Sequence, residues 1–187
     1  MRRSPTPDLE ALVSAQLERD QRIEPFMRER KCTRMRVSPH AFLRGTAALF
    51  YDLVRERGRV ATFPSAKGGL CGDLHLETFG VFRTNRPKKD RSHLVFAVNN
   101  FDDATEGPFV LDLLRLLTSL LLAVRAPLPD GEARLSLAKV CSNAYARAIV
   151  RGGGSAKRTP KGHLEISQSK KSLPAKLRTV LFLVDPA

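Results

Sequence analysis

Apolar side chains near the start of the chain recur every three or four residues, at Leu9, Leu12, Val13 and Leu17. This spacing predicts one face of a helix. Thr6-Pro7 precedes it, and a capping side chain followed by proline is typical of a helix start. The strongly basic stretch 28–36 interrupts the pattern. We therefore expect residues 1–37 to form an N-terminal helix followed by a basic linker.

A second helix is predicted to begin at Ser38-Pro39 and to continue through an apolar series as far as Gly58. From 59 to 100 the pattern changes to short apolar runs separated by glycine and proline, which is typical of strands and turns. Gly80–Phe82 and Leu94–Val98 fit the two arms of a hairpin. The basic segment 83–91 would join them.

Residues 109–126 are apolar on almost every side, which predicts a helix in the centre of the core. Asp112 and Arg115 interrupt its longest apolar run, so we expect no membrane span. A turn at 127–131 precedes an amphipathic helix over 132–150. The fold class is therefore α+β and helix-rich, with a core at 38–150 and a basic, glycine- and lysine-rich, partly disordered tail at 151–187.

The predicted hairpin brings two polar segments together. Asp73, His75 and Glu77 lie just before its first arm, and Asp102 and Asp103 lie just after its second. In an antiparallel pair these two ends lie side by side, so the side chains should converge. Clustered carboxylates suit a hard divalent cation that bridges to phosphate oxygens. One further carboxylate could then orient or deprotonate a nucleophile.

Several of these segments also carry a resemblance. They are Ser-Pro-His-Ala-Phe-Leu-Arg-Gly at 38–45, Phe-Tyr-Asp-Leu at 50–53, Gly-Asp-Leu-His at 72–75, Asn-x-Phe-Asp at 99–102, Gly-Pro at 107–108 and Leu-Asp-Leu-x-Arg at 111–115. Over residues 34–145 the chain resembles the bacterial domain of unknown function 2252 family. That family is itself similar to aminoglycoside-phosphotransferase and protein-kinase folds. The resemblance thus implies the catalytic lobe of a kinase-like fold.

The resemblance also implies roles for single residues. Asp73 occupies the place of the catalytic aspartate, with His75 beside it. Thr78 stands where relatives carry a metal-binding asparagine, and Asn100 where they carry a metal-binding aspartate. Both changes weaken the ligand set for a hard cation, so Mg²⁺ and ATP, the implied cofactors, should bind weakly. Asp102 or Asp103 could substitute.

The resemblance further implies a glycine-rich segment and a nucleotide-binding lysine after the matched region. The chain reaches Ala187 without either, and Gly152–Lys157 does not have the spacing of a phosphate-binding loop. We therefore expect a truncated or degenerate member of a phosphotransferase-like family. A missing nucleotide-binding lobe on a separate chain is the partner that would complete an active enzyme.

The same residues also have structural interpretations. Asp73 could cap a turn, and His75 could brace the loop through a hydrogen bond. Asp112 and Arg115, three residues apart on one helix, are predicted to form a structural ion pair. Cys71 fits a small buried thiol rather than a thiolate.

Charge and cysteine content add an alternative function. The formal net charge is +13, from 32 lysines and arginines against 19 acidic residues. Such an excess of positive charge favours polyanions as binding partners. The alternative to a phosphotransferase-like function is therefore a basic module that binds nucleic acid or another polyanion on the same scaffold. The three cysteines are odd in number and lack the spacing of a zinc site, which favours a reduced, cytoplasmic location.

Overall fold

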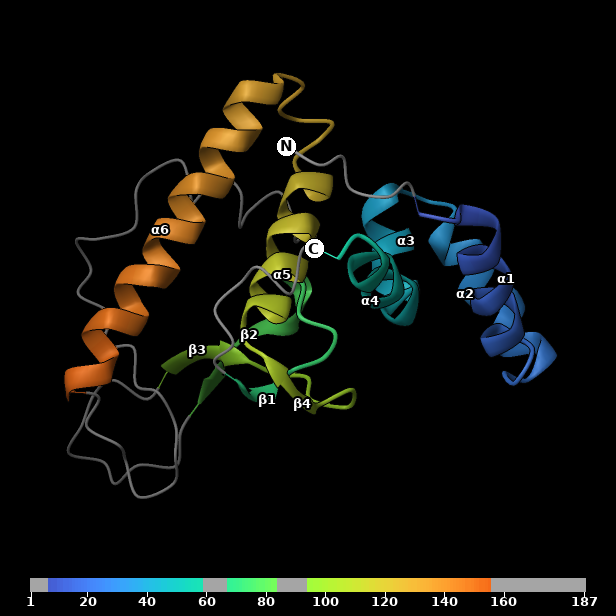
Figure 1. The fold of residues 1–187 in the computed structure, drawn as a ribbon, viewed down its shortest axis with the longest axis horizontal. Coiled ribbons are helices and arrows are strands. Elements are labelled where there is room, and N and C mark those ends of the chain that lie inside the picture. Colours follow the sequence, from blue (N-terminus) through green and yellow to red (C-terminus); the bar gives the residue numbers. More distant parts are fainter. Residues whose placement is uncertain (1–6, 59–66, 84–93, 156–187) are drawn as a thin grey trace. The chain divides into compact units, whose positions relative to one another are not determined.

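The computed structural model describes residues 7–58, 67–83 and 94–155, and its fold is α+β and helix-rich (Figure 1). The predicted Thr6 cap, most of the basic hairpin loop and the tail beyond Ser155 lie outside the described residues. The chain divides into two compact units. Unit 1 comprises Met1–His75 and Phe101–Leu122, and unit 2 comprises Leu76–Asn100 and Ala123–Ala187.

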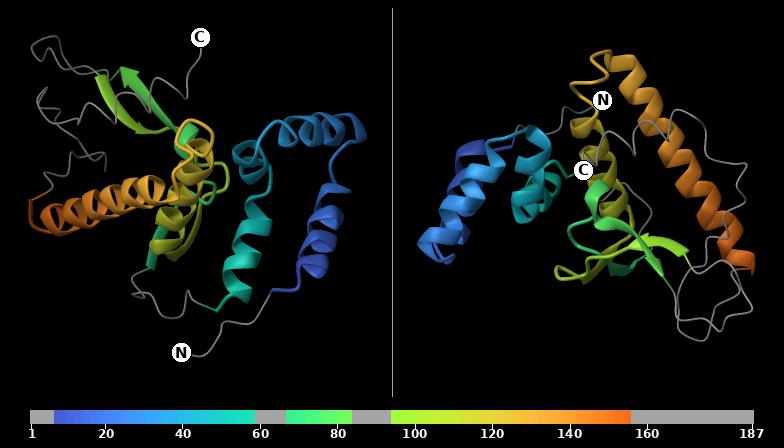
Figure 2. Two further views of the ribbon diagram at one scale, coloured as in Figure 1. Left: turned by 90° about the horizontal axis from the view of Figure 1, so that it is seen from above. Right: turned by 180° about the vertical axis from the view of Figure 1, so that it is seen from behind.

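Helix α1, Leu9–Asp20, begins at Asp8, whose side chain accepts a hydrogen bond from the backbone of Ala11. It packs on α4, and the left view of Figure 2 shows these two helices alongside each other, with α2 running across one end. Its buried side differs from the predicted apolar face. Leu12 is buried with two polar residues, Gln16 and Asp20, whereas Leu9, Val13 and Leu17 are exposed.

Polar contacts explain this reversal. Gln16 Nε2 donates to Asp20 Oδ1 at 3.0 Å, and Lys31 Nζ lies 2.6 Å from the same oxygen. Arg19 extends from α1 to Asp52 on α4, with Nη2 and Oδ2 2.5 Å apart. These bonds pair Gln16 Nε2, the Asp20 carboxylate and Arg19 Nη2, whereas Gln16 Oε1 and Arg19 Nη1 are buried without a hydrogen-bond partner among the described residues.

The predicted basic linker is a helix, α2, Pro25–Met35. Proline suits the first turn of a helix, and arginine, lysine and glutamate are good helix formers, so the basic stretch does not interrupt helical structure. The side of α2 that faces α3 includes Met35, which lies against Gly45 so closely that a β-carbon at Gly45 would overlap its sulfur atom.

The predicted helix over 38–58 is two helices, α3 (Pro39–Gly45) and α4 (Ala47–Glu56). The Ser38 cap is confirmed: its hydroxyl accepts from the Ala41 backbone at 3.0 Å, and Pro39 follows it. The break lies at Thr46, which has φ −133° and ψ 50°. Its hydroxyl donates to the Phe42 carbonyl at 2.7 Å.

Unit 1 also contains a small antiparallel sheet that the sequence analysis did not predict. Strand β1, Lys67–Leu70, pairs with β4, Thr105–Pro108, with Leu70 opposite Thr105. Gly68 accommodates the ring of Phe109, which a β-carbon would overlap. Because β4 leads directly into helix α5 and Pro108 lies opposite Lys67, this sheet places the start of α5 beside the start of β1.

Helix α5, Val110–Ala123, matches the predicted central helix in position. Its most buried side is partly polar, because Arg115 and Ser119 are fully buried and Leu120 is nearly so. Thr118 and Ser119 donate their hydroxyls to carbonyls of the preceding turn. None of the helices within the described residues combines the length and apolar character needed to cross a membrane.

Unit 2 contains the predicted hairpin, which is confirmed. Strand β2, Phe79–Arg83, pairs antiparallel with β3, Leu94–Val98, and the rings of Phe79 and Phe96 stack 5.5 Å apart. A short 3₁₀ helix, η2, Leu76–Thr78, precedes β2. Helix α6, Gly131–Ser155, begins close to the predicted position and continues through Gly152–Gly154, beyond its predicted end.

Candidate functional site

The candidate site is the loop 71–75, which follows β1 in unit 1. Gly72 has φ +82°, a conformation that side chains rarely adopt. A β-carbon on Gly72 would overlap the carbonyl oxygen of Asp103. The turn therefore requires glycine, and it packs directly against the segment that contains Asp103.

Two side chains fix the backbone of this turn. Asp112 on α5 accepts from the amides of Cys71, at 2.7 Å, and Gly72, at 3.3 Å. Tyr51 on α4 donates its hydroxyl to the Gly72 carbonyl. One residue of the loop is thus held through both its amide and its carbonyl, by two different helices.

Arg115 holds the side chain of Asp73. Its Nε lies 2.8 Å from Asp73 Oδ1, and its Nη2 donates to the same oxygen. Asp73 Oδ2 accepts neither of these bonds. The Asp73 side chain is 20% exposed, whereas the Arg115 side chain is fully buried. The carboxylate therefore has a fixed inner oxygen and an outer one on a partly exposed group.

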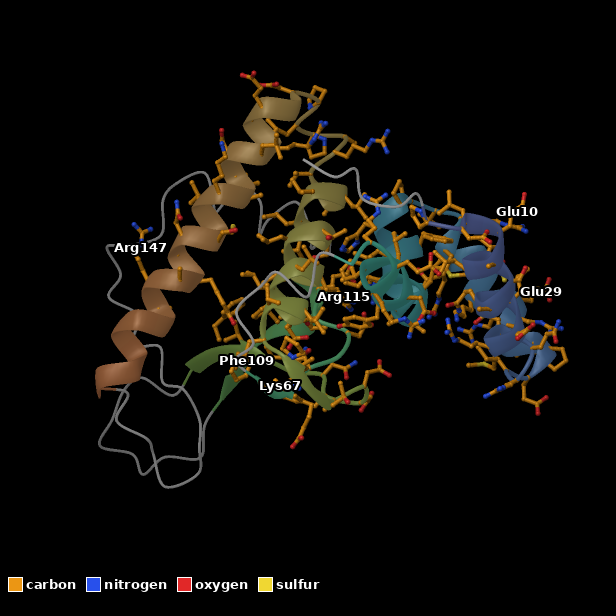
Figure 3. All side chains as sticks on the ribbon, viewed as in Figure 1. Glu10, Glu29, Lys67, Phe109, Arg115 and Arg147 are labelled. Atoms are coloured by element: carbon orange, nitrogen blue, oxygen red, sulfur yellow. The ribbon has the colours of Figure 1, made fainter. Side chains whose placement is uncertain are left out.

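Arg115 is itself held from several directions; Figure 3 labels it on α5. Its Nη2 donates to the Leu43 carbonyl at 2.9 Å. The guanidinium carbon lies 5.1 Å from the ring centre of Phe50 and 5.8 Å from that of Tyr51, which is within cation–π range. Among the described polar atoms, Arg115 Nη1 is buried without a hydrogen-bond acceptor.

Burial sets the ionisation of the loop. It raises the pKa of the Asp73 carboxyl above its ordinary value, although the positive charges of Arg115 and Arg44 act in the opposite direction. Burial and the nearby Asp112 carboxylate raise the pKa of Cys71 to about 11. Burial also raises the pKa of Tyr51. Cys71 and Tyr51 are thus neutral near pH 7, and Cys71 is the protonated thiol that the sequence predicts.

His75 is buried beside this pair. Its Nε2 lies 3.7 Å from Asp73 Oδ2, and its ring meets that of His40 edge to face, with centres 6.3 Å apart. The 3.7 Å between His75 Nε2 and Asp73 Oδ2 is longer than a hydrogen bond, so these two side chains form an ion pair only when His75 is protonated. The structure places His75 next to the outer oxygen of Asp73.

The predicted metal positions fall in both units. In unit 2 the Asn99 amide donates to the Thr78 carbonyl at 2.8 Å, so the segments that contain Thr78 and Asn100 run side by side beyond the hairpin. Thr78 is buried and Asn100 is exposed. In unit 1 Asp102 and Asp103 are exposed, and Asp103 lies against Gly72.

These residues do not make a built divalent-metal centre. Within residues 7–58, 67–83 and 94–155, the structure contains no group of three or more His, Cys, Asp or Glu side chains that could hold a metal ion. The donors at positions 78 and 100 are neutral. Hard cations depend on charged oxygen ligands, so the residues present do not fit Mg²⁺.

The contacts of Asp112 and Arg115 differ from the predicted ion pair, and the contact of Tyr51 was not predicted. Asp112 and Arg115, predicted to pair with each other, instead contact the loop: Asp112 binds its backbone, and Arg115 binds Asp73. The role of Tyr51 was missed, although it lies in the Phe-Tyr-Asp-Leu segment that carried the family resemblance. Tyr51 directly follows the buried Phe50 on α4, and this position was the sequence signal that could have indicated its role.

A separate cavity of about 780 Å³ lies in unit 1 between α3, α4 and α5. Its lining is almost entirely apolar, and Arg57 is the single charged residue among the lining residues. Thr46 and Thr118 also line it, but their hydroxyls donate to carbonyls of their own chain segments. The cavity therefore lacks the convergent polar groups that the loop 71–75 provides.

Comparison with known proteins gives one match. Residues 23–181 match a family described as "Uncharacterized protein conserved in bacteria (DUF2252)". The match includes α2, the loop 71–75 and α5. No curated protein and no solved structure matches the chain.

Proposed function

Because the chain belongs to this uncharacterised bacterial family, DUF2252, we propose that it is a degenerate phosphotransferase-like protein. In this proposal the chain keeps the loop that orients a catalytic aspartate, Asp73. It has lost the metal-binding aspartate and asparagine that the resemblance implies, through Asn100 and Thr78, and with them efficient phosphotransfer. The proposal joins the α+β fold and the family match to the kinase-like resemblance of the Gly-Asp-Leu-His and Asn-x-Phe-Asp segments.

The fixed position of Asp73 is the observation that carries this proposal. A surface aspartate that only caps a turn does not need a fully buried arginine behind it. Here Arg115 binds one oxygen of Asp73, while Asp112 and Tyr51 hold the adjacent backbone. Such support is typical of a functional group whose orientation matters.

Asp73 would act through its outer oxygen. That oxygen could accept a hydrogen bond from the hydroxyl of an acceptor molecule and orient it, as the aspartate of phosphotransferases does. Burial raises the Asp73 pKa, which makes the carboxylate a better proton acceptor than an exposed aspartate. Since the residues at positions 78 and 100 do not fit Mg²⁺, we derive no step through a metal ion.

Calorimetry with magnesium tests the proposal. The variant Asn100→Asp/Thr78→Asn restores one charge and one amide oxygen at the two substituted positions. We expect weak Mg²⁺ and Mg²⁺–ATP binding by the unmodified chain, no phosphate transfer, and at least tenfold tighter Mg²⁺ binding by the variant. Phosphate transfer also depends on placement of the nucleotide, so Mg²⁺ affinity and not turnover is the measured quantity.

A matched control separates a site effect from a change in net charge. Asn143→Asp/Thr33→Asn makes the same two replacements at exposed positions of α6 and α2. It should leave Mg²⁺ affinity unchanged. Equal affinities of both variants and the unmodified chain would refute the degenerate-site proposal, and so would robust ATP turnover by the unmodified chain.

A further inference from the structure

Helix α2 has two distinct faces. Its half-buried residues are Arg28, Lys31, Cys32 and Met35, which recur at helical spacing and form its inner face. Lys31 pairs with Asp20, and Met35 lies against Gly45. No residue of α2 is fully buried. The opposite side of the helix therefore faces away from the rest of unit 1.

The outer face combines large apolar residues with arginines. Phe26, Arg30 and Arg34 are spaced four residues apart and are all exposed, with Met27 beside them. Val37 lies just beyond the C-terminal end of the helix. Val37 is 79% exposed and Phe26 67%, the two highest values among the exposed large apolar residues of the described chain.

The two arginines are available for an outside partner. Neither Arg30 nor Arg34 forms an ion pair within the described part of the chain. Arg30 instead lies over the ring of Phe26, with 5.7 Å between its guanidinium carbon and the ring centre. Glu29, labelled in Figure 3, is the one acidic residue of the helix, against four basic residues.

This composition favours one class of partner. A nucleic acid would contact the arginines and could stack on Phe26, but it offers nothing to Met27 or Val37. A lipid surface uses both parts, because apolar side chains enter the headgroup region while arginines bind lipid phosphates. We propose that the outer face of α2, defined by Phe26, Met27, Arg30, Arg34 and Val37, docks the protein on an anionic membrane surface.

Sedimentation with phospholipid vesicles tests this proposal. The full chain should bind vesicles of phosphatidylglycerol and phosphatidylcholine but not vesicles of phosphatidylcholine alone. Arg30→Gln/Arg34→Gln should weaken binding roughly 30-fold, from about fivefold for each charge. Phe26→Ser/Val37→Ser should weaken it by at least about tenfold, because both side chains would lose their apolar contact with lipid.

Two matched controls define the surface. Arg125→Gln/Arg147→Gln removes the same charge from exposed positions elsewhere, and Leu135→Ser/Val140→Ser removes exposed apolar side chains of α6. Both should retain vesicle binding within about twofold of the unmodified chain, a change small beside the effect of two surface charges. Circular dichroism should show that all four variants stay folded.

Three outcomes would overturn the proposal. One is no binding of the folded, unmodified chain to the anionic vesicles. Another is equal loss of binding in the α2 and control variants, which would indicate net charge alone. The third is full retention of binding by Phe26→Ser/Val37→Ser, with tight binding of duplex DNA that Arg30→Gln/Arg34→Gln abolishes. That result would assign the face to nucleic acid.

Discussion

Arg115 and Asp73 form an asymmetric ion pair in which Nε and Nη2 of the arginine both donate to the same carboxylate oxygen, Oδ1. The arginine comes from α5 and is fully buried, whereas the aspartate lies in the loop after β1 and is partly exposed. This arrangement fixes the Asp73 side chain through one oxygen. The other oxygen stays on the side of His75.

Replacement of Arg115 should destabilise the fold strongly. Arg115→Met removes the charge that offsets the half-buried Asp73 carboxylate, and loss of one member of a buried pair costs about 3–5 kcal/mol. Because Asp73 is partly exposed, we expect a loss near the lower end, about 3 kcal/mol in the free energy of unfolding. Urea denaturation measures this loss directly.

The control is a double-mutant cycle. Asp73→Asn/Arg115→Met has no uncompensated carboxylate, so it should be more stable than Arg115→Met alone. Arg115→Lys keeps the charge but loses the planar group that reaches Asp73, Leu43 and the Phe50 ring together, so it should remain destabilised. Additive single effects in the cycle would contradict a direct coupling between Asp73 and Arg115.

Gly72→Ala should disrupt the loop for two separate reasons. A positive φ costs a residue with a side chain about 1 kcal/mol, and the added methyl group would also overlap the Asp103 carbonyl. We expect a total loss of about 2–4 kcal/mol in unfolding free energy, since relief of the overlap must move backbone. Thermal or urea unfolding measures it.

Two other glycines separate the causes. Gly58 also has a positive φ, of 61°, but no atom of the described residues lies within 4 Å of its added β-carbon, so Gly58→Ala should show the strain alone. Gly69 has neither feature, so Gly69→Ala should be close to neutral. If Gly72→Ala reduced the free energy of unfolding no more than Gly58→Ala, this result would contradict the close approach of the Asp103 carbonyl to Gly72.

The sequence predicted those parts of the fold that follow from local periodicity and turn chemistry. The Ser38 cap, the β2–β3 hairpin and the position of α5 all have signals within a few neighbouring residues. The pairing of β1 with β4 had no such signal. Its strands have only four residues each, contain glycines and are far apart in sequence, so only tertiary contacts define them.

Two predictions about helices were wrong for a physical reason. The basic stretch was assigned to a linker because its charges hide any apolar face, yet arginine and lysine favour helices, and α2 includes it. The buried side of α1 was predicted to be apolar, but hydrogen bonds allow Gln16 and Asp20 to be buried there. Hydropathy does not reveal such compensated polar groups.

The sequence singled out residues of the loop 71–75 but did not predict their contacts. Asp73 and His75 were identified from the Gly-Asp-Leu-His segment, and the structure places them beside each other. The sequence spacing of Asp112 and Arg115 suggested that they pair with each other. Their real partners lie about forty residues away in the chain, and only the fold brings them together.

Tyr51 should ionise above the ordinary tyrosine pKa of 10.0, because burial of the phenol raises its pKa. The chain has two tyrosines, so Tyr145→Phe leaves Tyr51 as the only one to follow by near-ultraviolet absorbance. Folding favours the neutral phenol, so stability should fall as the pH rises beyond about 10. Ionisation at the ordinary pH in the folded protein would contradict the burial of the Tyr51 phenol.

Cys71 should react slowly with thiol reagents near pH 8. Its pKa of about 11, against an ordinary value of 9.0, leaves roughly 100-fold less thiolate than an unperturbed cysteine has. The variant Cys32→Ser/Cys141→Ser isolates Cys71, and its alkylation rate by iodoacetamide should rise with a midpoint near pH 11. Folding favours the neutral thiol, so its contribution to stability should disappear as the pH rises from about 9 through 11.

Asp112→Asn tests the cause of this shift. Burial is its largest cause and would persist, but the negative charge beside Cys71 would be lost, so the midpoint should move part of the way towards 9.0. The asparagine oxygen can still accept from the Cys71 and Gly72 amides. Asp130→Asn, an equal charge change at a residue that caps α6, should leave the midpoint unchanged. If both variants moved it equally, the Asp112 carboxylate would not be its specific neighbour.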